Sequence, residues 1–290
     1  MRIEARAKIN WTLDITGQRA DGYHLMDMLM QSVTLHDVIT LTPANEITLT
    51  CGGEPLLPAD AHHLALRAAL ALRDYTGCRK GAAIHVEKRI PVGAGMGGGS
   101  ADAAAVLAGL NLIWDTGLDQ EELEALGLTL GADVPFCLRG GLTRTTGVGE
   151  IMENLPCGRC YPLVVTQPCE GLSTREIFAA YHQEKAPVRP DNEAAAIALA
   201  DGDAPALATA MANVMQPVST LRRPEIAQAI AMLKENGAFC AQMTGSGSAV
   251  IGAFTDAAAA DAACAALRAR WPRVWRCESC LKGMVIHHED

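Results

Sequence analysis

The feature that most constrains this chain is the glycine-rich stretch Pro91–Ala105, which reads PVGAGMGGGSADAAA. Because glycine lacks a Cβ and readily adopts positive φ, the backbone of such a stretch can approach a ligand closely. The alanine-rich segment from Ser100 to about Asn111 has the composition of a helix. A helix start directs free N–H groups and a positive dipole end at one spot. The stretch therefore predicts a phosphate-binding turn built on Gly93, Gly95, Gly97, Gly98 and Gly99.

Other glycine loops fit this stretch less well. It is not a Walker A loop, because no Gly-Lys-Ser/Thr closes it. Gly93, Gly95 and Gly98 do satisfy G-x-G-x-x-G, but a dinucleotide site needs a second strand that ends in an acid about 20 residues later. That region instead holds Trp114–Gly117 and a second helical run. A plain glycine linker is the remaining alternative, although a linker has no reason to run straight into a helix.

Length and charge limit the class of protein. A chain of 290 residues is long enough for two domains. The net charge is −9 and no basic tract is present, so nucleic-acid binding is not expected. No apolar run reaches the length of a membrane span, and the N-terminus lacks the apolar core of a signal peptide. We expect a cytoplasmic protein without a membrane partner.

The ten cysteines are expected to be reduced thiols in that compartment. Two pairs have metal-ligand spacing, Cys157–Cys160 and Cys277–Cys280. A zinc ribbon separates its pairs by about 15–20 residues, whereas these pairs are more than a hundred residues apart. A structural zinc would require the fold to bring the pairs together, and no metal ligand is assigned.

The N-terminal segment Ile3–Ile15 alternates apolar and polar residues without interruption. This pattern predicts a strand with one buried face and one polar face. Lys8 and Asn10 share the polar face, and the alternation alone favours a face that meets solvent.

Two turns carry residues suited to chemistry. The turn Gly17–His24 delivers Tyr23 and His24, which can stack on a base and bond its edge or can simply pack the loop down. Asp133 is a lone carboxylate in the apolar, proline-containing turn Leu130–Phe136. Its structural alternative is an Asx-turn that satisfies nearby N–H groups.

The rest of the pattern predicts two domains, 1–155 and 156–290, of which the second is a compact α+β unit. The turn Thr244–Ser248 also has spare backbone donors and can face the first glycine turn across a cleft. Helices are expected over His62–Tyr75, Ser100–Asn111, Asp119–Leu126, Ser173–Tyr181, Glu193–Ala200, Pro205–Val214, Pro224–Asn236 and Ala257–Arg270. Strands are expected over Val33–Thr42, Glu46–Thr50, Ala82–Arg89, Tyr161–Thr166, Phe239–Gln242, Ala249–Phe254 and Val274–His287, with a hairpin near Gly147–Glu150.

Three segments together resemble the superfamily of galactose, homoserine, mevalonate and phosphomevalonate kinases (GHMP kinases): the N-terminal strand, the glycine loop with its helix, and the late glycine turn. Four further marks resemble the branch that phosphorylates 4-diphosphocytidyl-2-C-methyl-D-erythritol in non-mevalonate isoprenoid synthesis. These are Ala7–Asn10 (AKIN), Gly22–His24 (GYH), Leu130–Pro135 (LGADVP) and Gly147–Glu150 (GVGE). The resemblance covers essentially the whole chain.

The resemblance implies an α+β, two-domain GHMP-kinase fold. An N-terminal ribosomal-protein-S5-like nucleotide domain and a C-terminal ferredoxin-like domain would flank the active site. It also implies ATP with Mg²⁺ as the phosphoryl donor, and a monomer or homodimer. Asp133 matches the catalytic base that accepts the proton of the C2 hydroxyl, and Lys8 matches its electrostatic partner. The ATP-binding positions implied are Pro91, Gly93, Gly95, Met96, Gly97, Gly98, Gly99, Ser100 and Ala101.

For the cytidine substrate, Tyr23 and Phe178 match an aromatic pair around cytosine, and His24 matches the residue that reads its edge. The remaining substrate positions implied are Asn10, Thr174, Gly245 and Ser246. One departure is His62-His63-Leu64, where the family commonly has Asp-Asn-Leu in the adenine pocket. The alternatives are a homoserine- or mevalonate-type kinase, which the aromatic pair argues against, and a catalytically silent relative, which should lack Lys8 or Asp133.

Overall fold

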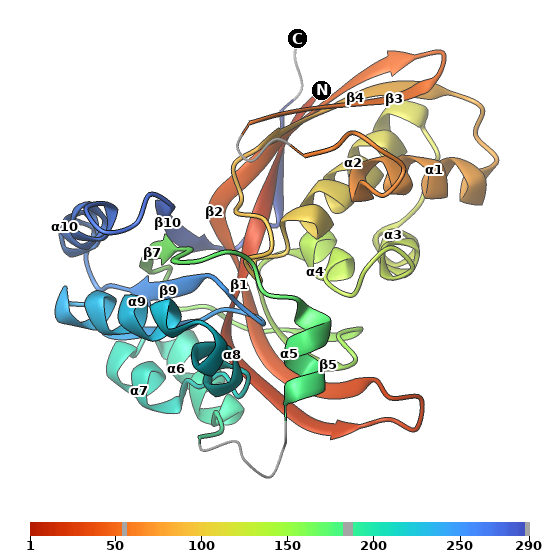
Figure 1. The fold of residues 1–290 in the computed structure, drawn as a ribbon. Coiled ribbons are helices and arrows are strands. Elements are labelled where there is room, and N and C mark those ends of the chain that lie inside the picture. Colours follow the sequence, from red (N-terminus) through yellow and green to blue (C-terminus); the bar gives the residue numbers. More distant parts are fainter. Residues whose placement is uncertain (54–56, 182–187, 288–290) are drawn as a thin grey trace.

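The structure is a computed structural model that describes residues 1–53, 57–181 and 188–287 (Figure 1). Two long antiparallel strands, β1 (Arg2–Gln18) and β2 (His24–Ala44), run through the middle of the molecule. The predicted turn joins them, with Gly22 at φ 90°. β11 (Met284–His287) pairs with the other edge of β1, so the end of the described chain lies beside its beginning.

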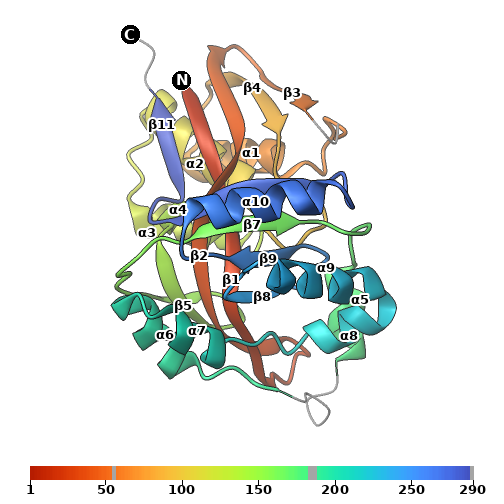
Figure 2. The ribbon, with the colours of Figure 1, turned by 90° about the vertical axis from the view of Figure 1, so that its left-hand side faces the viewer.

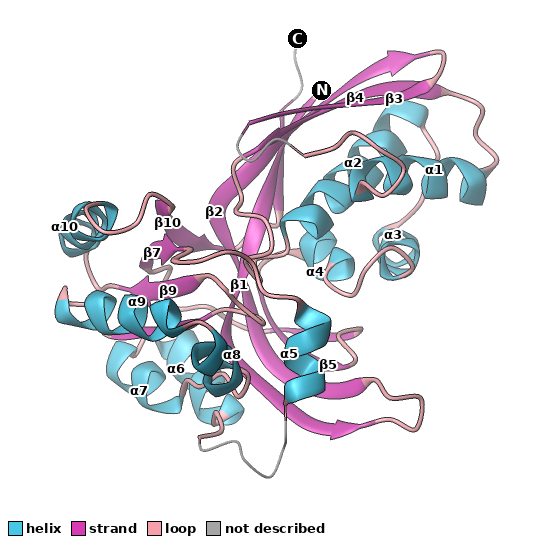
Figure 3. Cartoon of the chain, viewed as in Figure 1, coloured by secondary structure: helices cyan, strands magenta, loops and turns pink. Residues whose placement is uncertain are grey.

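The first lobe adds strands at both ends of β2. At one end, β2 pairs with β4 (Gly81–Lys88), and β4 pairs in parallel with β3 (Ile47–Gly53). At the other end, β2 pairs with β5 (Leu142–Gly147), and β5 pairs with β6 (Ile151–Asn154). Four helices lie to one side of the hairpin (Figure 3). They are α1 (Leu64–Thr76), α2 (Gly98–Trp114), α3 (Gln120–Leu128) and α4 (Val134–Arg139).

The second lobe joins the same sheet through β10 (Val274–Cys280), which pairs with β2 on one side and β7 (Pro162–Thr166) on the other. The sheet continues through β9 (Val250–Ala253) to β8 (Cys240–Met243). In Figure 2, α10 (Ala257–Arg268) covers β7, and α9 (Pro224–Glu235) covers β8 and β9. The other helices are α5 (Thr174–Ala180), α6 (Asn192–Asp201), α7 (Ala204–Ala210) and α8 (Gln216–Arg222).

The α+β architecture is confirmed, as are the predicted strands and most predicted helices. α4 and α8 were not predicted, and α7 ends at Ala210 rather than Val214. The boundary at 155/156 stays a prediction. Within the described ranges no helix is both long and apolar enough to cross a membrane.

The expectation that the polar face of the first strand meets solvent is wrong from Lys8 onward. Lys8, Asn10, Thr12 and Asp14 are all buried. The second lobe covers this face: the Asn10 N–H donates to Thr244 Oγ1 at 2.9 Å, and the Arg189 guanidinium bonds the Asp14 carboxylate at 2.9 Å. Alternation reports which residues share a face, but a polar face can point into a cleft as well as into water.

Candidate active site

The glycine loop connects β4 to α2 and has the conformation that its composition predicts. Gly93, Gly95 and Gly97 adopt φ of 65°, 77° and 70°, and Gly97 is the N-cap of α2. A Cβ on Gly95 would lie 2.4 Å from the Thr244 carbonyl oxygen, so this position admits no side chain. The first N–H groups of α2, from Gly98 to Ser100, lie at this turn and have no carbonyl partner within the helix, whereas the Ala101 N–H already donates to the Gly97 carbonyl at 2.8 Å.

Lys8 lies beside the same loop because of an irregularity in β1. The register between β1 and β2 shifts between Arg6 and Lys8 and again between Asn10 and Thr12. At such bulges a backbone N–H is released from the ladder, and the Lys8 N–H donates instead to the Met96 carbonyl at 3.0 Å. The Lys8 ammonium donates to Asn10 Oδ1 at 2.9 Å, and the Lys8 side chain is only 6% exposed.

Asp133 stands at the N-cap of α4 and faces Lys8. Its Oδ2 lies 3.6 Å from Lys8 Nζ, and its side chain is 33% exposed. The carboxylate makes no capping hydrogen bond to the helix, so the Asx-turn alternative is wrong. A Cβ on Gly97 would lie 3.1 Å from Lys8 Cγ and 3.6 Å from Asp133 Oδ2. An amine, a carboxylate and a phosphate-type loop from three distant segments therefore meet at one point.

Below the loop lies a buried ionic cluster that the sequence reasoning did not find. Lys88 Nζ, at the end of β4, donates to Asp37 Oδ2 on β2 and to Asp102 Oδ2 on α2, the latter at 2.8 Å. Asp37 Oδ1 also accepts the N–H groups of Arg89 at 2.5 Å and Ile90 at 2.8 Å. The cluster thus ties the strand before the loop to the helix after it.

Burial is the largest influence on Asp102 and raises its pKa; Lys88 opposes this and Asp37 reinforces it, for a pKa of about 8. Its second oxygen, Oδ1, has no hydrogen-bond partner. Burial lowers the pKa of Lys88, but Asp102 and Asp37 together outweigh it and raise that pKa.

The second glycine turn, Thr244–Ser248, packs directly on the first. The Ala249 N–H donates to the Ala94 carbonyl at 3.2 Å, and a Cβ on Gly245 would lie 2.8 Å from the Gly95 carbonyl oxygen. Ser246 Oγ lies 2.8 Å from Thr174 Oγ1 at the start of α5. The predicted positions Thr174, Gly245 and Ser246 are therefore neighbours, adjacent to the phosphate loop.

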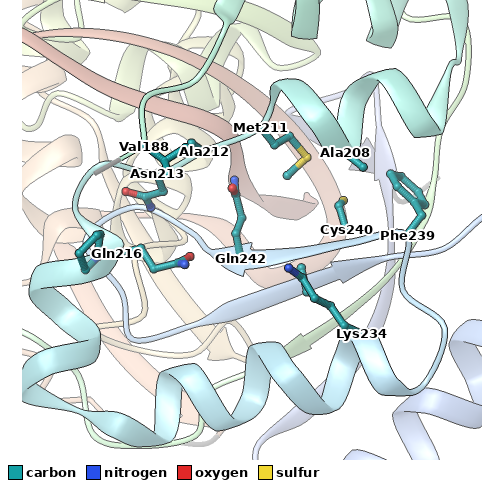
Figure 4. Close-up of a pocket in the computed structure, with 12 residues that line it drawn as sticks. Val188, Ala208, Met211, Ala212, Asn213, Gln216, Lys234, Phe239, Cys240 and Gln242 are labelled. Atoms are coloured by element: carbon teal, nitrogen blue, oxygen red, sulfur yellow. The ribbon is translucent and has the colours of Figure 1, made fainter. Parts of the chain in front are cut away.

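Two amide side chains hold the turn Thr244–Ser248 and β1 together through hydrogen bonds. Asn213 Nδ2 donates to the carbonyls of Met243 and Gly245, both at 2.8 Å. Gln242 Nε2 donates to the carbonyls of Asn10 at 3.1 Å and Trp11 at 2.8 Å. Figure 4 shows Asn213 and Gln242 among the residues that line a cavity of about 340 Å³. They connect β1 and the turn into one unit.

The aromatic residues are partly brought together. The rings of His24 and Phe178 have centroids 4.9 Å apart and an interplanar angle of 33°. Tyr23 is 65% exposed at the exit of the turn between β1 and β2. The structure therefore joins β2 and α5 through His24 and Phe178. It shows no ring contact between Tyr23 and Phe178, and whether these two rings flank a base stays a prediction.

A larger cavity of about 1090 Å³ opens beside the first residues of the loop. Lys88, Pro91 and Gly93 line it together with Leu35, Leu57 and Trp275. His62 and His63 are not among its lining residues. His63 caps α1 by accepting the Ala65 N–H at 3.2 Å, and burial, followed by the charge of Lys88, lowers its pKa. His63, where the chain departs from the family pattern, therefore has a structural role as the N-cap of α1.

The family models for the GHMP kinases match this chain, the N-terminal domain over residues 63–141 and the C-terminal domain over residues 195–273. Fold and site together define an ATP-dependent kinase of the GHMP class.

Two curated relatives are similar along most of their length, and both are named 4-diphosphocytidyl-2-C-methyl-D-erythritol kinase. The protein of Symbiobacterium thermophilum is 43% identical over 88% of this chain and 91% of its own. That of Pelotomaculum thermopropionicum is 44% identical over 87% and 88%. A crystal structure of 4-(cytidine 5'-diphospho)-2C-methyl-D-erythritol kinase superimposes with a TM-score of 0.84 at 34% identity, over 96% of this chain and 99% of that one. The chain belongs to the 4-diphosphocytidyl-2-C-methyl-D-erythritol kinase family.

Proposed function

We propose that this protein transfers the γ-phosphoryl group of ATP to the C2 hydroxyl of 4-diphosphocytidyl-2-C-methyl-D-erythritol, with Asp133 as the general base and Lys8 as its electrostatic partner. The observation that carries the assignment of roles is the 3.6 Å approach of Lys8 Nζ to Asp133 Oδ2 beside Gly97. The family relatives support the choice of substrate.

In this mechanism Asp133 accepts the proton of the C2 hydroxyl as its oxygen attacks the γ-phosphorus. The bond from the γ-phosphorus to the oxygen bridging it to the β-phosphorus breaks, and ADP leaves. Phosphoryl transfer depends mainly on positioning and charge stabilisation, which is the part proposed for Lys8. Because Lys8 is buried and held by Asn10, its ammonium needs little reorganisation during the reaction.

The phosphates of ATP are proposed to bind the turn from Gly95 to Ser100 and the start of α2. This helix has 17 residues and begins in a glycine turn with free N–H groups, the arrangement that binds anions. The nucleoside would occupy the 1090 Å³ cavity, which shares Pro91 and Gly93 with the loop. Its volume is slightly above the range of about 300–1,000 Å³ that is usual for ligand pockets.

The cytidine end of the acceptor is proposed to bind between the turn 17–24 and α5. Tyr23 and Phe178 would stack on the two faces of cytosine and His24 would bond its edge. Thr174, Gly245 and Ser246 would contact the ribose and diphosphate. The contact between His24 and Phe178 supports this location, because it places the two predicted segments side by side.

Magnesium is proposed to enter with the nucleotide rather than to occupy a protein cage. Within the described residues no group of three or more His, Cys, Asp or Glu side chains is arranged to hold a metal ion. Ser100, in the first turn of α2, offers a hydroxyl next to the proposed phosphate site. When bound, Mg²⁺ would neutralise charge on the phosphate oxygens.

The test is a coupled ADP-release assay with 4-diphosphocytidyl-2-C-methyl-D-erythritol, homoserine and mevalonate as acceptors. We expect turnover with the cytidine compound alone. Turnover with homoserine or mevalonate in preference would contradict the substrate assignment. Tight binding of the cytidine compound without ADP release would identify a catalytically silent relative.

A further inference from the structure

The fold brings the pair Cys157 and Cys160 close to Cys280, one member of the second pair, although more than a hundred residues separate them in the sequence. Cys157 and Cys160 lie in the segment between β6 and β7, and Cys280 ends β10. The β7–β10 pairing sets Glu278 opposite Pro162, and beyond it the Ser279 N–H donates to the Tyr161 carbonyl at 3.0 Å. Cys160, next to Tyr161, therefore lies against the end of β10.

Cys157 and Cys160 are separated by only two residues in this connecting segment. The Cys157 thiol lies near that of Cys160, because after burial it is the group that most raises the pKa of Cys160, and Ser279 acts in the opposite direction. The chain folds back between them, because Cys157 Sγ donates to the Arg159 carbonyl at 3.2 Å. Cys280 also raises the pKa of Cys160, though less than Cys157 does, whereas Cys277 is buried at 4% exposure.

A metal centre does not fit this cluster, since the described residues contain no group of three such ligands with suitable geometry. A dithiol does fit. All ten cysteines are free thiols, Cys160 is exposed, and Cys157 is partly exposed behind it. A Cys-x-x-Cys pair with one accessible and one recessed thiol is the usual arrangement for thiol–disulfide exchange.

We propose that Cys157 and Cys160 form a redox dithiol that low-molecular-weight disulfides such as oxidised glutathione convert to an intramolecular disulfide. The Cys160 thiolate attacks one sulfur of oxidised glutathione, which forms a mixed disulfide and expels one glutathione thiolate. The Cys157 thiolate then attacks the Cys160 sulfur and expels the second. The two cysteine protons pass to the two departing thiolates, so two thiols and one disulfide give one disulfide and two thiols.

Hydrogen bonds connect the Cys157 thiol to β1. Cys157 Sγ accepts a hydrogen bond from Gln31 Nε2 at 3.4 Å, and Gln31 Oε1 accepts from Trp11 Nε1 at 2.6 Å. Trp11 follows Asn10 in β1. Burial, followed by the neighbouring Cys157, raises the pKa of Cys160, so the exchange is slow at neutral pH compared with that of a catalytic thiol.

The test is incubation of the full-length protein with oxidised glutathione, followed by alkylation of free thiols and peptide mapping by mass spectrometry. Wild-type protein should acquire one disulfide between Cys157 and Cys160, which dithiothreitol removes. Cys157→Ser should accumulate one glutathionyl group on Cys160. Cys160→Ser should acquire neither product at this site. Cys51→Ser, which alters a partly exposed thiol on β3, is the matched control and should behave as wild type.

Three outcomes would overturn the proposal. They are a stable glutathionyl group on Cys160 in the wild type, a cross-link from Cys160 to Cys280 in place of the proposed one, and full alkylation of Cys157 and Cys160 after oxidation. A Cys280→Ser variant should retain the Cys157–Cys160 disulfide, and its loss would likewise count against the pairing.

Discussion

The buried cluster of Lys88, Asp37 and Asp102 gives a prediction in which the sign of a pH dependence follows from the structure. One cation is shared by two carboxyl groups, and all three side chains are essentially inaccessible to solvent. Asp102 has a pKa of about 8 in the folded protein against an ordinary value of 3.8. At neutral pH its side chain therefore holds a proton in the folded state and releases it on unfolding.

The difference between the folded and unfolded pKa values of Asp102 makes the free energy of unfolding depend on pH. Between the two pKa values the folded state binds one more proton than the unfolded state, so the contribution of Asp102 to stability falls as pH rises. The fall is about 1.4 kcal/mol per pH unit and ends above the folded pKa. Asp102→Asn removes the titration and keeps the shape. The free energy of unfolding of the variant minus that of wild type should therefore rise by about 1.4 kcal/mol per pH unit.

The assay is urea unfolding of both proteins at about pH 5.5, 6.5 and 7.5, which lie between the two pKa values. Asp74→Asn is the control, because its side chain is 78% exposed, and its difference from wild type should not change with pH. A difference between Asp102→Asn and wild type that stays constant or shrinks as pH rises would refute the reasoning. Lys88→Met should be destabilising by about 3–5 kcal/mol, since it leaves the buried carboxyl groups without their cation.

Three further predictions concern catalysis and binding. Asp133→Asn should lower kcat by about 10²–10⁴-fold with nucleotide affinity unchanged, because a general base is lost; a variant that keeps half its rate in the ADP-release assay would make this carboxylate structural. Tyr23→Ala should raise KM for the cytidine substrate by about tenfold, since stacking on a base contributes about 1–3 kcal/mol. Tyr75→Ala, which truncates another exposed tyrosine, is the matched control. An unchanged KM in Tyr23→Ala would exclude the proposed stacking. Gly95→Ala should weaken ATP binding measured by calorimetry, because its Cβ would lie 2.4 Å from the Thr244 carbonyl oxygen. Gly117→Ala has the same left-handed strain at φ 73° but open space around it, so equal effects of the two substitutions on ATP affinity would contradict a specific clash.

Local patterns in the sequence predicted most elements but not every helix. The helix α1 closes at Gly77 in the left-handed conformation, and α3 begins with the Asp119–Glu122 capping box, both of which are local signals. The helix α4 was missed because Pro135 suggested a turn. Proline is tolerated in the first turn of a helix, where its missing N–H needs no partner.

The glycine loop and the resemblance predicted part of the site. The sequence did not predict the part that depends on ion pairs between side chains distant in the sequence. The approach of Lys8 to Asp133 was anticipated, whereas the Lys88 cluster was overlooked. One signal was available for that cluster: Ala82, Ile84 and Val86 form the buried face of β4, and Lys88 continues the same face. A charge on an apolar face requires a partner, but period-2 alternation cannot say which distant acid provides it.

The backbone bonds of β1 explain why both lobes are needed for the proposed chemistry. The Lys8 N–H is held by Met96 in the first lobe, whereas the Asn10 N–H and C=O are held by Thr244 and Gln242 in the second. Lys8 and Asn10 in turn bond each other through their side chains. A displacement of either lobe would therefore have to break buried hydrogen bonds at Lys8 or Asn10, and each unpaired buried group costs about 1–3 kcal/mol. The orientation of Lys8 toward Asp133 is thus fixed before any ligand binds, which is the preorganisation that phosphoryl transfer requires.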